Sequence, residues 1–507
     1  MSAVASGHRI ELFLDFEFAV NHDALDRLTS LQLKHVSRLE WVHPSRLAGD
    51  KPVMDKPIWE LQEWHVSRDL HAFVRVILDS RPSRSSEHPH CLRLTQYARN
   101  LVTGTYRETL STGGADAAQS SPGRSRRGVA LVLPGDPRAV ELHIEHVTLH
   151  LFRTGVAIAV VTLTLPAHQA EPPNEGVAAE LLIEVLPRLC GVGGQHALRW
   201  LSPGPTADTK GFGLGDLLTP LVSGAGLSAT ARHRIYSLCA LTFSAPLTDA
   251  QRVDTSLRLS RQYHSSFRTA TETPGTTFLR PFANVLHAVS REGTCSIIDN
   301  SLNPDGRRND VLADWLHNSH HRVYLPLHLV ALHQYIVLLR LGHGAGRHVE
   351  FETASDRELG ELTALCNQIR FFRLAYRLVQ VSTITMHDLV YSAVEKSLGI
   401  SELSEKIARD LMAVEPRLLE LSAQRVERRY RWLTRVLAGG FAYLTLSGVG
   451  THIATAISEK ANAVPIWATL AIQSVSIIMA AVAFIIVGSR AQSVKPSVED
   501  TIGAAVD

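Results

Sequence analysis

The chain has 507 residues, which is too long for one ordinary domain and predicts two or three. Its 51 Lys and Arg residues balance 49 Asp and Glu residues, so charge gives no reason to expect a nucleic acid as partner. A hydrophobic content of 45% with 20% charged residues excludes global disorder. Five scattered cysteines without a C-x-x-C pair fit a reducing compartment, and the first residues lack the pattern of a cleavable signal peptide. We therefore expect most of the chain in the cytosol.

The first 320 residues mix strand and helix patterns and predict a mixed α/β cytosolic domain over residues 1–320. Arg9–Phe18 alternates apolar and polar residues with period two, which is typical of a strand. Glu141–Phe152 and Val156–Leu165 are predicted as a hairpin, because the connection between them is short and ends in glycine. Two further strands and one helix are expected: Ser237–Ser244, Thr294–Asp299, and Val177–Leu186 with Pro187 just beyond it.

Two segments of this predicted domain lack the apolar residues of a packed element. Gly104–Gly128 is rich in Gly, Ser, Ala and Arg, and we expect a disordered insertion at residues 104–128. Leu201–Leu217 is rich in Pro and Gly and is expected to form a loop.

Residues 321–435 predict a long helical stalk. Arg322–Leu341 is apolar almost all round, which is typical of a buried helix. A later helix is expected to end at Gly399, and the next one runs towards residue 435. Pro416 is expected to kink that helix or to mark its start. Its last turns contain no Gly or Pro, so we expect it to continue directly into the following apolar segment.

Two long segments without charged residues follow the stalk. Residues 436–457 are 22 positions without Asp, Glu, Lys or Arg, and residues 461–489 are another 29. A helix that spans a bilayer needs about 20 mostly apolar residues. We therefore predict a transmembrane hairpin over residues 436–489, with a cytosolic tail at 490–507. The alternative, two buried helices of a soluble domain, fits two long consecutive segments less well.

The flanking charges predict the orientation of this hairpin. Five arginines lie between residues 425 and 435, and Arg490 and Lys495 follow the second segment. The short connection at residues 458–463 holds one Lys and one Glu. Because positive residues stay on the cytosolic side, both termini are expected in the cytosol and the connection outside.

The first predicted span is rich in Gly, Ser and Thr, whereas the second is plainly apolar. Two helices per chain cannot enclose a pore, so conduction would require several copies with the first span around the axis. Alternatively, the small residues pack only the hairpin or a dimer. The residues alone leave both interpretations open.

The sequence contains two groups of histidines but no motif of a known catalytic site. In a regular strand His146 and His150 point to one face and His143 to the other, so the three should not converge. A denser group has no carboxylate or cysteine at metal-binding spacing, and its role stays open. The group comprises His317, His320, His321, His328, His333, His343 and His348. Walker A, G-x-S-x-G and H-E-x-x-H motifs are absent from the sequence, so we do not predict an enzyme.

The order of an α/β cytosolic domain, long stalk helices and two membrane helices with a short outer loop resembles the CorA-type magnesium channel superfamily, in particular its divergent bacterial CorA-like members. The resemblance covers about Glu350–Arg490 and extends to Phe152–Leu165 and Leu325–Leu341. It implies a homo-oligomer, specifically a pentamer, in the bacterial inner membrane, with the first membrane helix lining the pore. It also implies Mg²⁺ or another divalent cation as the transported or regulatory ion, and no resident cofactor is expected.

The family's Gly-Met-Asn triplet at the outer end of the first membrane helix is absent from this sequence. Counted back from the outer loop, its place falls at Gly448-Val449-Gly450 or Gly450-Thr451-His452. The resemblance therefore implies a pore entrance formed by Gly448, Gly450, Thr451 and His452, with Tyr443, Ser447 and Thr455 along the path. Alternatively, His452 lies among lipid headgroups.

Two function classes follow from these observations. The first is a divalent-cation channel or transporter, which the hydroxyl-rich first span favours. The alternative is a non-conducting membrane-anchored sensor or scaffold whose cytosolic domain binds a ligand or partner, which the missing triplet favours.

Overall fold

The computed structural model divides into two compact units, residues 1–352 with 367–407, and residues 353–366 with 408–507. It describes residues 4–460 with internal gaps, and Ser474 and Ile478 beyond them. The gaps are residues 19–22, 33–55, 81–89, 104–105, 108–124, 127–128, 133–138, 166–176, 192–197, 201–211, 230–234, 244, 265–266, 268–274, 300–314, 347–355, 377 and 379.

The first unit is built on a large mixed sheet, which confirms the predicted mixed α/β fold. Its main path runs β10-β6-β7-β8-β1-β12-β15-β14-β13, so β1 lies in the middle. Along this path only β12 and β15 pair in parallel. The strands are β1 (Val4–Glu17), β2 (Trp59–Gln62), β3 (His90–Leu94), β4 (Tyr106–Arg107), β5 (Ser125–Arg126), β6 (Val129–Val132), β7 (Ala139–Leu151), β8 (Val156–Thr164), β9 (Val177–Ala178), β10 (Leu198–Trp200), β11 (Ser228–Ala229), β12 (Tyr236–Phe243), β13 (Thr277–Phe282), β14 (Val285–Val289) and β15 (Gly293–Asp299).

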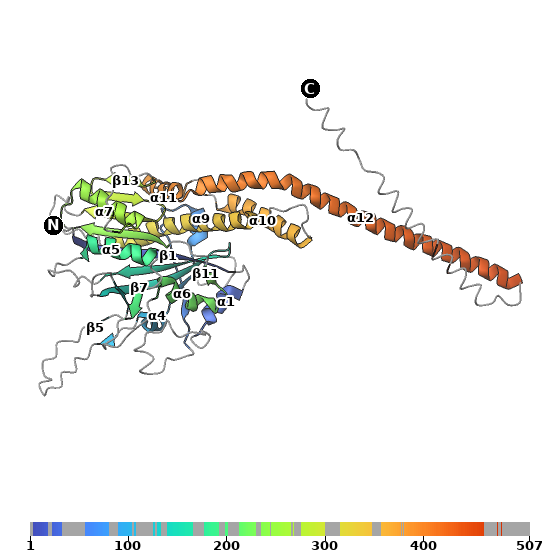
Figure 1. Cartoon of the computed structure of the whole chain (residues 1–507), viewed down its shortest axis with the longest axis horizontal. Helices are drawn as coiled ribbons and strands as arrows, with labels where there is room; N and C mark the ends of the chain where they lie inside the picture. Colours follow the sequence, from blue (N-terminus) through green and yellow to red (C-terminus); the bar gives the residue numbers. More distant parts are fainter. Residues whose placement is uncertain are drawn as a thin grey trace, which may run out of the picture. The chain divides into compact units, whose positions relative to one another are not determined.

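Helices of the first unit cover both faces of this sheet. The helices that belong wholly to it are α1 (Asp23–Ser30), α3 (Ala72–Leu78), α4 (Gln96–Thr103), α5 (Ala179–Cys190), α6 (Leu214–Ser223), α7 (Asp249–Arg261), the π-helix η7 (Trp315–Tyr324), α9 (Leu325–Gly346) and α11 (Thr385–Leu398). Two helices contribute residues to both units, α10 (Asp356–Ala375) and α12 (Ile400–Lys460). Figure 1 shows α5 beside α7 and α9 beside α11.

One face of the sheet, here called the core face, carries the main hydrophobic core. On β1 it presents Ile10, Leu12, Leu14 and Phe16, which pack with residues of α1, α5 and α6. Burial of apolar side chains is the main stabilising contribution to such a fold. The opposite face, here called the histidine face, presents Glu11, Phe13 and Asp15 on β1, because successive side chains of a strand point to opposite sides. The helices η7 and α9 contact this second face.

Local sequence signals account for the strands near the centre of the sheet. The expected strands Arg9–Phe18, Ser237–Ser244 and Thr294–Asp299 correspond to β1, β12 and β15. The predicted hairpin is also confirmed, since β7 and β8 pair antiparallel around Arg153-Thr154-Gly155. Gly155 has φ of 78°, a left-handed conformation that glycine adopts without the steric cost of a Cβ.

A bulge in β7 changes which face its histidines occupy. Glu145 has no partner on β8, because the pairing steps from Ile144↔Leu163 to His146↔Thr162. The core residues of β7 accordingly switch from even to odd positions, and they are Leu142, Ile144, Val147, Leu149 and Leu151. The expectation that His143 points away from the face of His146 and His150 is therefore wrong. All three lie opposite the core residues.

Several expected boundaries differ in the structure. Pro187 lies inside α5 rather than beyond the helix. The expected loop Leu201–Leu217 is too long, because α6 begins at Leu214. Pro416 lies inside α12 and does not mark its start. Within the predicted insertion, β4 and β5 pair with each other, and residues 108–124 lie outside the described part of the chain.

The segment that the sequence assigns to the beginning of the stalk belongs to the first unit. Arg322–Leu341 falls largely in α9, whose Leu327, Leu329 and Val330 are almost fully buried. Its all-round apolar character is thus that of a core helix. At the other end of this helical region, α11 ends at Leu398, and Gly399 follows it with φ of 69°, which confirms the expected helix terminus.

Candidate functional site

The predicted first membrane span lies on α12, a single helix of 61 residues. Figure 1 draws this helix without interruption. Gly448 lies on it, and a side chain at that position would meet no atom within 4 Å. The other six expected pore residues lie on the same helical backbone, at positions whose side chains fall outside the description: Tyr443, Ser447, Gly450, Thr451, His452 and Thr455.

The second predicted span falls outside the described residues except at Ser474 and Ile478. Within the described part of the chain, one helical stretch is long and apolar enough to cross a bilayer, Ser319–Gly344. Its most apolar window is 78% buried inside the protein, as expected for a core helix. The transmembrane hairpin therefore stays a prediction.

The part of α12 that precedes the predicted span, together with the first residues of the span, carries exposed apolar side chains at regular spacing. Met412, Leu419, Val426 and Leu433 follow one another at intervals of seven and are half or more exposed. Tyr430 and Leu437 stand four residues after Val426 and Leu433 and are also exposed. Alternating steps of three and four residues place apolar groups on one stripe of a helix, as in coiled coils. We call these six residues the α12 stripe.

A buried acid lies at the centre of the histidine face. Glu11 on β1 and His320 on η7 both have 0% of their surface exposed, and Glu11 Oε2 lies 3.0 Å from His320 Nε2. The guanidinium of Arg9 donates to Glu11 Oε1 at 3.0 Å. Burial by itself would raise the pKa of the Glu11 carboxyl, but His320 and Arg9 lower it to about 2. The acid is therefore held ionised inside the protein.

A second chain of hydrogen bonds joins α9 to β15 and β12. His328 donates from Nδ1 to the carbonyl oxygen of Tyr324 at 2.7 Å, which leaves Nε2 to accept from Thr294 Oγ1 at 3.0 Å. Tyr236 Oη lies 2.8 Å from the same Thr294 hydroxyl. Burial lowers the pKa of His328 to about 4, so this imidazole is neutral at pH 7. These hydrogen bonds connect α9 to β15 and β15 to β12.

Other histidines of this face are buried and neutral as well. His287 Nδ1 lies 2.8 Å from Ser296 Oγ on the neighbouring strand, and burial lowers the pKa of His287 to about 3. His333 lies 2.8 Å from Thr154 Oγ1 and stacks on Phe152, and burial lowers its pKa to about 3. Burial likewise lowers the pKa of His150 to about 3.

The structure brings part of the predicted histidine group near Glu11, since His320, His321 and His328 all interact electrostatically with this carboxyl. His320, His328 and His333 are buried and each has its own hydrogen-bond partner, whereas His343 is exposed. The side chain of His317 and the whole of His348 lie outside the described residues. The part of the chain that the structure describes contains no group of three or more His, Cys, Asp or Glu side chains that could hold a metal ion. What the sequence did not reveal is the acid Glu11, which looks like an ordinary polar position of an alternating strand.

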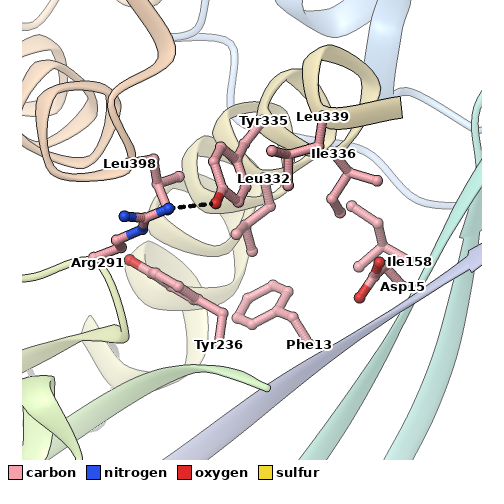
Figure 2. A pocket seen from close by; sticks show the side chains of 10 residues that line it. All are labelled: Phe13, Asp15, Ile158, Tyr236, Arg291, Leu332, Tyr335, Ile336, Leu339 and Leu398. Carbon is pink, nitrogen blue, oxygen red and sulfur yellow. Dashed lines mark hydrogen bonds between the residues drawn. The ribbon is translucent and has the colours of Figure 1, made fainter. Parts of the chain in front are cut away.

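A cavity of about 60 Å³ lies between the histidine face and α9 (Figure 2). The sheet contributes Phe13 and Asp15 of β1, Ile158 of β8 and Tyr236 of β12. The remaining lining residues are Arg291, Leu332, Tyr335, Ile336, Leu339 and Leu398. The cavity thus shares Tyr236 with the buried hydrogen-bond chain.

Comparison with family models, with curated proteins and with solved structures finds no match for this chain.

Proposed function

We propose that this chain is a CorA-like protein of the bacterial inner membrane that assembles as a homo-oligomer and passes divalent cations. The observation that carries the proposal is α12, one helix from Ile400 to Lys460 that contains both the arginine-rich stretch and the charge-free segment 436–457. At 1.5 Å per residue its 61 residues extend about 90 Å. One helix can therefore belong to the folded unit at its start and to a bilayer at its end.

Charge supports the same topology. Five arginines precede the charge-free segment within eleven residues, and Arg490 and Lys495 follow the second one. Arginine and lysine stay on the cytosolic side of a membrane. In the proposed arrangement both termini are cytosolic, and only the short connection at residues 458–463 lies outside.

The α12 stripe supports assembly of several copies. Its apolar side chains are exposed on the single chain, and a repeat of seven residues is the spacing that packs one helix against another of the same kind. A pentamer is the state that the resemblance implies. Such an assembly would bring the Gly- and Thr-rich first spans together around one axis.

In this proposal Gly448, Gly450, Thr451 and His452 form the outer entrance of the pore. Hydroxyl and imidazole groups coordinate a partly hydrated cation more weakly than carboxylates do. Imidazole also suits zinc-like ions better than magnesium. The transported ion is therefore Mg²⁺ or another divalent cation, with His452 raising the preference for the softer one.

The test is cation flux into liposomes that contain the purified full-length protein. We expect uptake of Mg²⁺ or Zn²⁺ above that of empty liposomes. His452→Ala should lower Zn²⁺ uptake more than Mg²⁺ uptake. The matched control His343→Ala removes an exposed histidine of the first unit and should leave both rates unchanged.

A second candidate function is a non-conducting membrane-anchored sensor or scaffold, and the missing Gly-Met-Asn triplet favours it. In that case the hairpin only anchors the protein, and the first unit binds a ligand or partner. Absence of uptake for every divalent cation tested, with the protein correctly inserted, would overturn the transport proposal and support this one.

A further inference from the structure

The cavity on the histidine face combines apolar walls with two opposite charges (Figure 2). Phe13, Ile158, Leu332, Ile336 and Leu339 supply most of the apolar wall. A volume of about 60 Å³ has room for about four to six water-sized atoms. Small-molecule sites are typically apolar pockets with a few polar groups that orient the ligand. The size limits any occupant to a very small molecule.

One side of the cavity presents hydrogen-bond donors. Arg291, in the connection between β14 and β15, donates from Nη2 to Tyr335 Oη of α9 at 3.0 Å. A guanidinium carries five N–H groups, so this bond leaves donors for an anion, and the Tyr335 hydroxyl keeps its own proton to donate. Planar guanidinium groups bind carboxylates especially well, because two parallel hydrogen bonds can form.

The other side of the cavity presents an acid. In Figure 2 Asp15 lies beside Ile158, with Phe13 and Tyr236 between it and Arg291. The pairing explains this order, since Asp15 is opposite Ile158 on β8, and Phe13 is opposite Tyr236 on β12. A second negative charge at the Asp15 end would be repelled, whereas an uncharged alkyl end would contact the apolar wall.

We propose that this cavity binds a short-chain monocarboxylate. The carboxylate accepts hydrogen bonds from Arg291 and Tyr335, and the alkyl chain lies against Phe13, Leu332 and Ile336. Asp15 excludes a dicarboxylate of the same length. The binding step is independent of the proposed transport, so a failure of cation flux and a failure of ligand binding are distinguishable.

The position of Leu398 connects this site to α12. Leu398 lines the cavity and is the last residue of α11. Gly399 follows with φ of 69°, and α12 begins at Ile400. The amide of Gly399 is bonded to Lys396 O, and its carbonyl accepts from the amide of Leu403, so this glycine joins both helices. A ligand that packs against Leu398 restricts the motion of this junction.

The experiment is isothermal titration of the purified full-length protein in mild detergent with butyrate. Two probes with the same four-carbon chain serve as ligand controls, butyramide, which lacks the charge, and succinate, which has two. We expect butyrate to bind in the millimolar range or tighter. Butyramide and succinate should each bind about tenfold more weakly or not at all, since bonds to a charged group and repulsion between like charges are of that size.

Three variants locate the site. Arg291→Gln should weaken butyrate binding about tenfold or more. The matched control is Arg280→Gln. It changes an exposed arginine on β13 that pairs with Asp249 on α7, and it should leave butyrate binding unchanged. Asp15→Asn should raise the affinity for succinate, a gain that loss of folding cannot mimic. Thermal unfolding of each variant checks that the first unit remains folded.

Three results would overturn the proposal. They are equal binding of butyrate and butyramide, equal effects of Arg291→Gln and Arg280→Gln, and no gain of succinate binding in Asp15→Asn. The link to α12 has its own readout. Saturating butyrate should slow hydrogen exchange of the amides from Lys396 to Leu403, and unchanged exchange there would overturn that link.

Discussion

Glu11 and His320 are 309 positions apart in the sequence and lie 3.0 Å apart in the interior, at the middle of the central sheet. Neither side chain has exposed surface. This contact joins β1, the first strand of the sheet, to η7. Because a buried charge is costly unless a partner compensates it, the folded unit has to keep the two elements together. The contact therefore holds together two segments of the first unit that are far apart in the chain.

We predict that Glu11→Gln destabilises the protein by about 3–5 kcal/mol, the usual cost of breaking a buried ion pair from one side, because it leaves Arg9 without its carboxylate partner. Urea unfolding followed by circular dichroism measures the effect. The control is Glu60→Gln, which removes an exposed pair with Arg93 on neighbouring strands and should cost at most about 1 kcal/mol. Similar losses in both variants would contradict the role of the buried pair.

Acid should destabilise the first unit over a defined range. Burial lowers the pKa of His328 to about 4, and those of His150, His287 and His333 to about 3, whereas unfolded histidine titrates near 6.5. Between these values the unfolded chain binds more protons, so the free energy of unfolding falls as pH decreases from about 6.5 towards 4. Glu11 adds a loss in the same direction from about 4.5 towards 2.

The measurement for this prediction is the free energy of unfolding as a function of pH. Each buried neutral histidine contributes a slope of up to about 1.4 kcal/mol per pH unit. His328→Gln removes one such group and should reduce the slope by up to about 1.4 kcal/mol per pH unit. His343→Gln changes an exposed histidine and should leave it as it is. A flat profile between pH 6.5 and 4.5 would refute the prediction.

Gly293 begins β15 at a point where the chain passes very close to β12. A Cβ there would lie 2.4 Å from Ser237 Oγ and 2.6 Å from Ser237 O, far inside normal contact. We expect Gly293→Ala to cost about 1–3 kcal/mol, as overpacking does. Gly360→Ala, in the open interior of α10, should instead stabilise by up to about 1 kcal/mol in thermal or urea unfolding. Equal effects would show that the close approach is unimportant.

The α12 stripe should determine the oligomeric state. Val426→Asp and Leu433→Asp place a charge in the stripe, and desolvating it in a helix interface is unfavourable. Native mass spectrometry in mild detergent should show an oligomer for the wild type and smaller species for these variants. Gln424→Asp adds the same charge outside the stripe and should leave the mass unchanged. A wild-type monomer would rule out the proposed assembly.

The proposed topology predicts opposite accessibility of two engineered cysteines. Ala461→Cys should react with an impermeant thiol reagent from outside the cell, and Ser493→Cys should react only after the membrane is permeabilised. All five native cysteines are buried, so background labelling should be low. The reverse pattern would overturn the orientation that the arginines predict.

Several elements could be predicted from the sequence because the signals that form them are local. The alternation in Arg9–Phe18 is enough for β1, since one apolar face must be buried. Gly155 and Gly399 each mark a place where the backbone needs a positive φ, which glycine adopts most readily. The absence of Gly and Pro between residues 424 and 436 likewise predicted that α12 continues as one helix.

Other features of the fold could not be predicted, because they depend on contacts between residues that are distant in the sequence. The bulge at Glu145 arises from the pairing of β7 with β8, and it alone moves His143 to the face of His146 and His150. The apolar sequence of α9 fits a buried helix both in a stalk and in a globular unit. Only its contacts with the sheet show that it belongs to the first unit.

The alternation of the central strands, the glycine turns and the charge-free segments that predict a membrane hairpin are each set by neighbours along the chain, so they can be found in the sequence alone. The burial and ionisation of Glu11, and the cavity that Arg291, Tyr335 and Asp15 line together, become visible only in the folded chain. The reason is physical. The ionisation and role of a polar group depend on its solvation and on the charges beside it, and both come from residues distant in the chain.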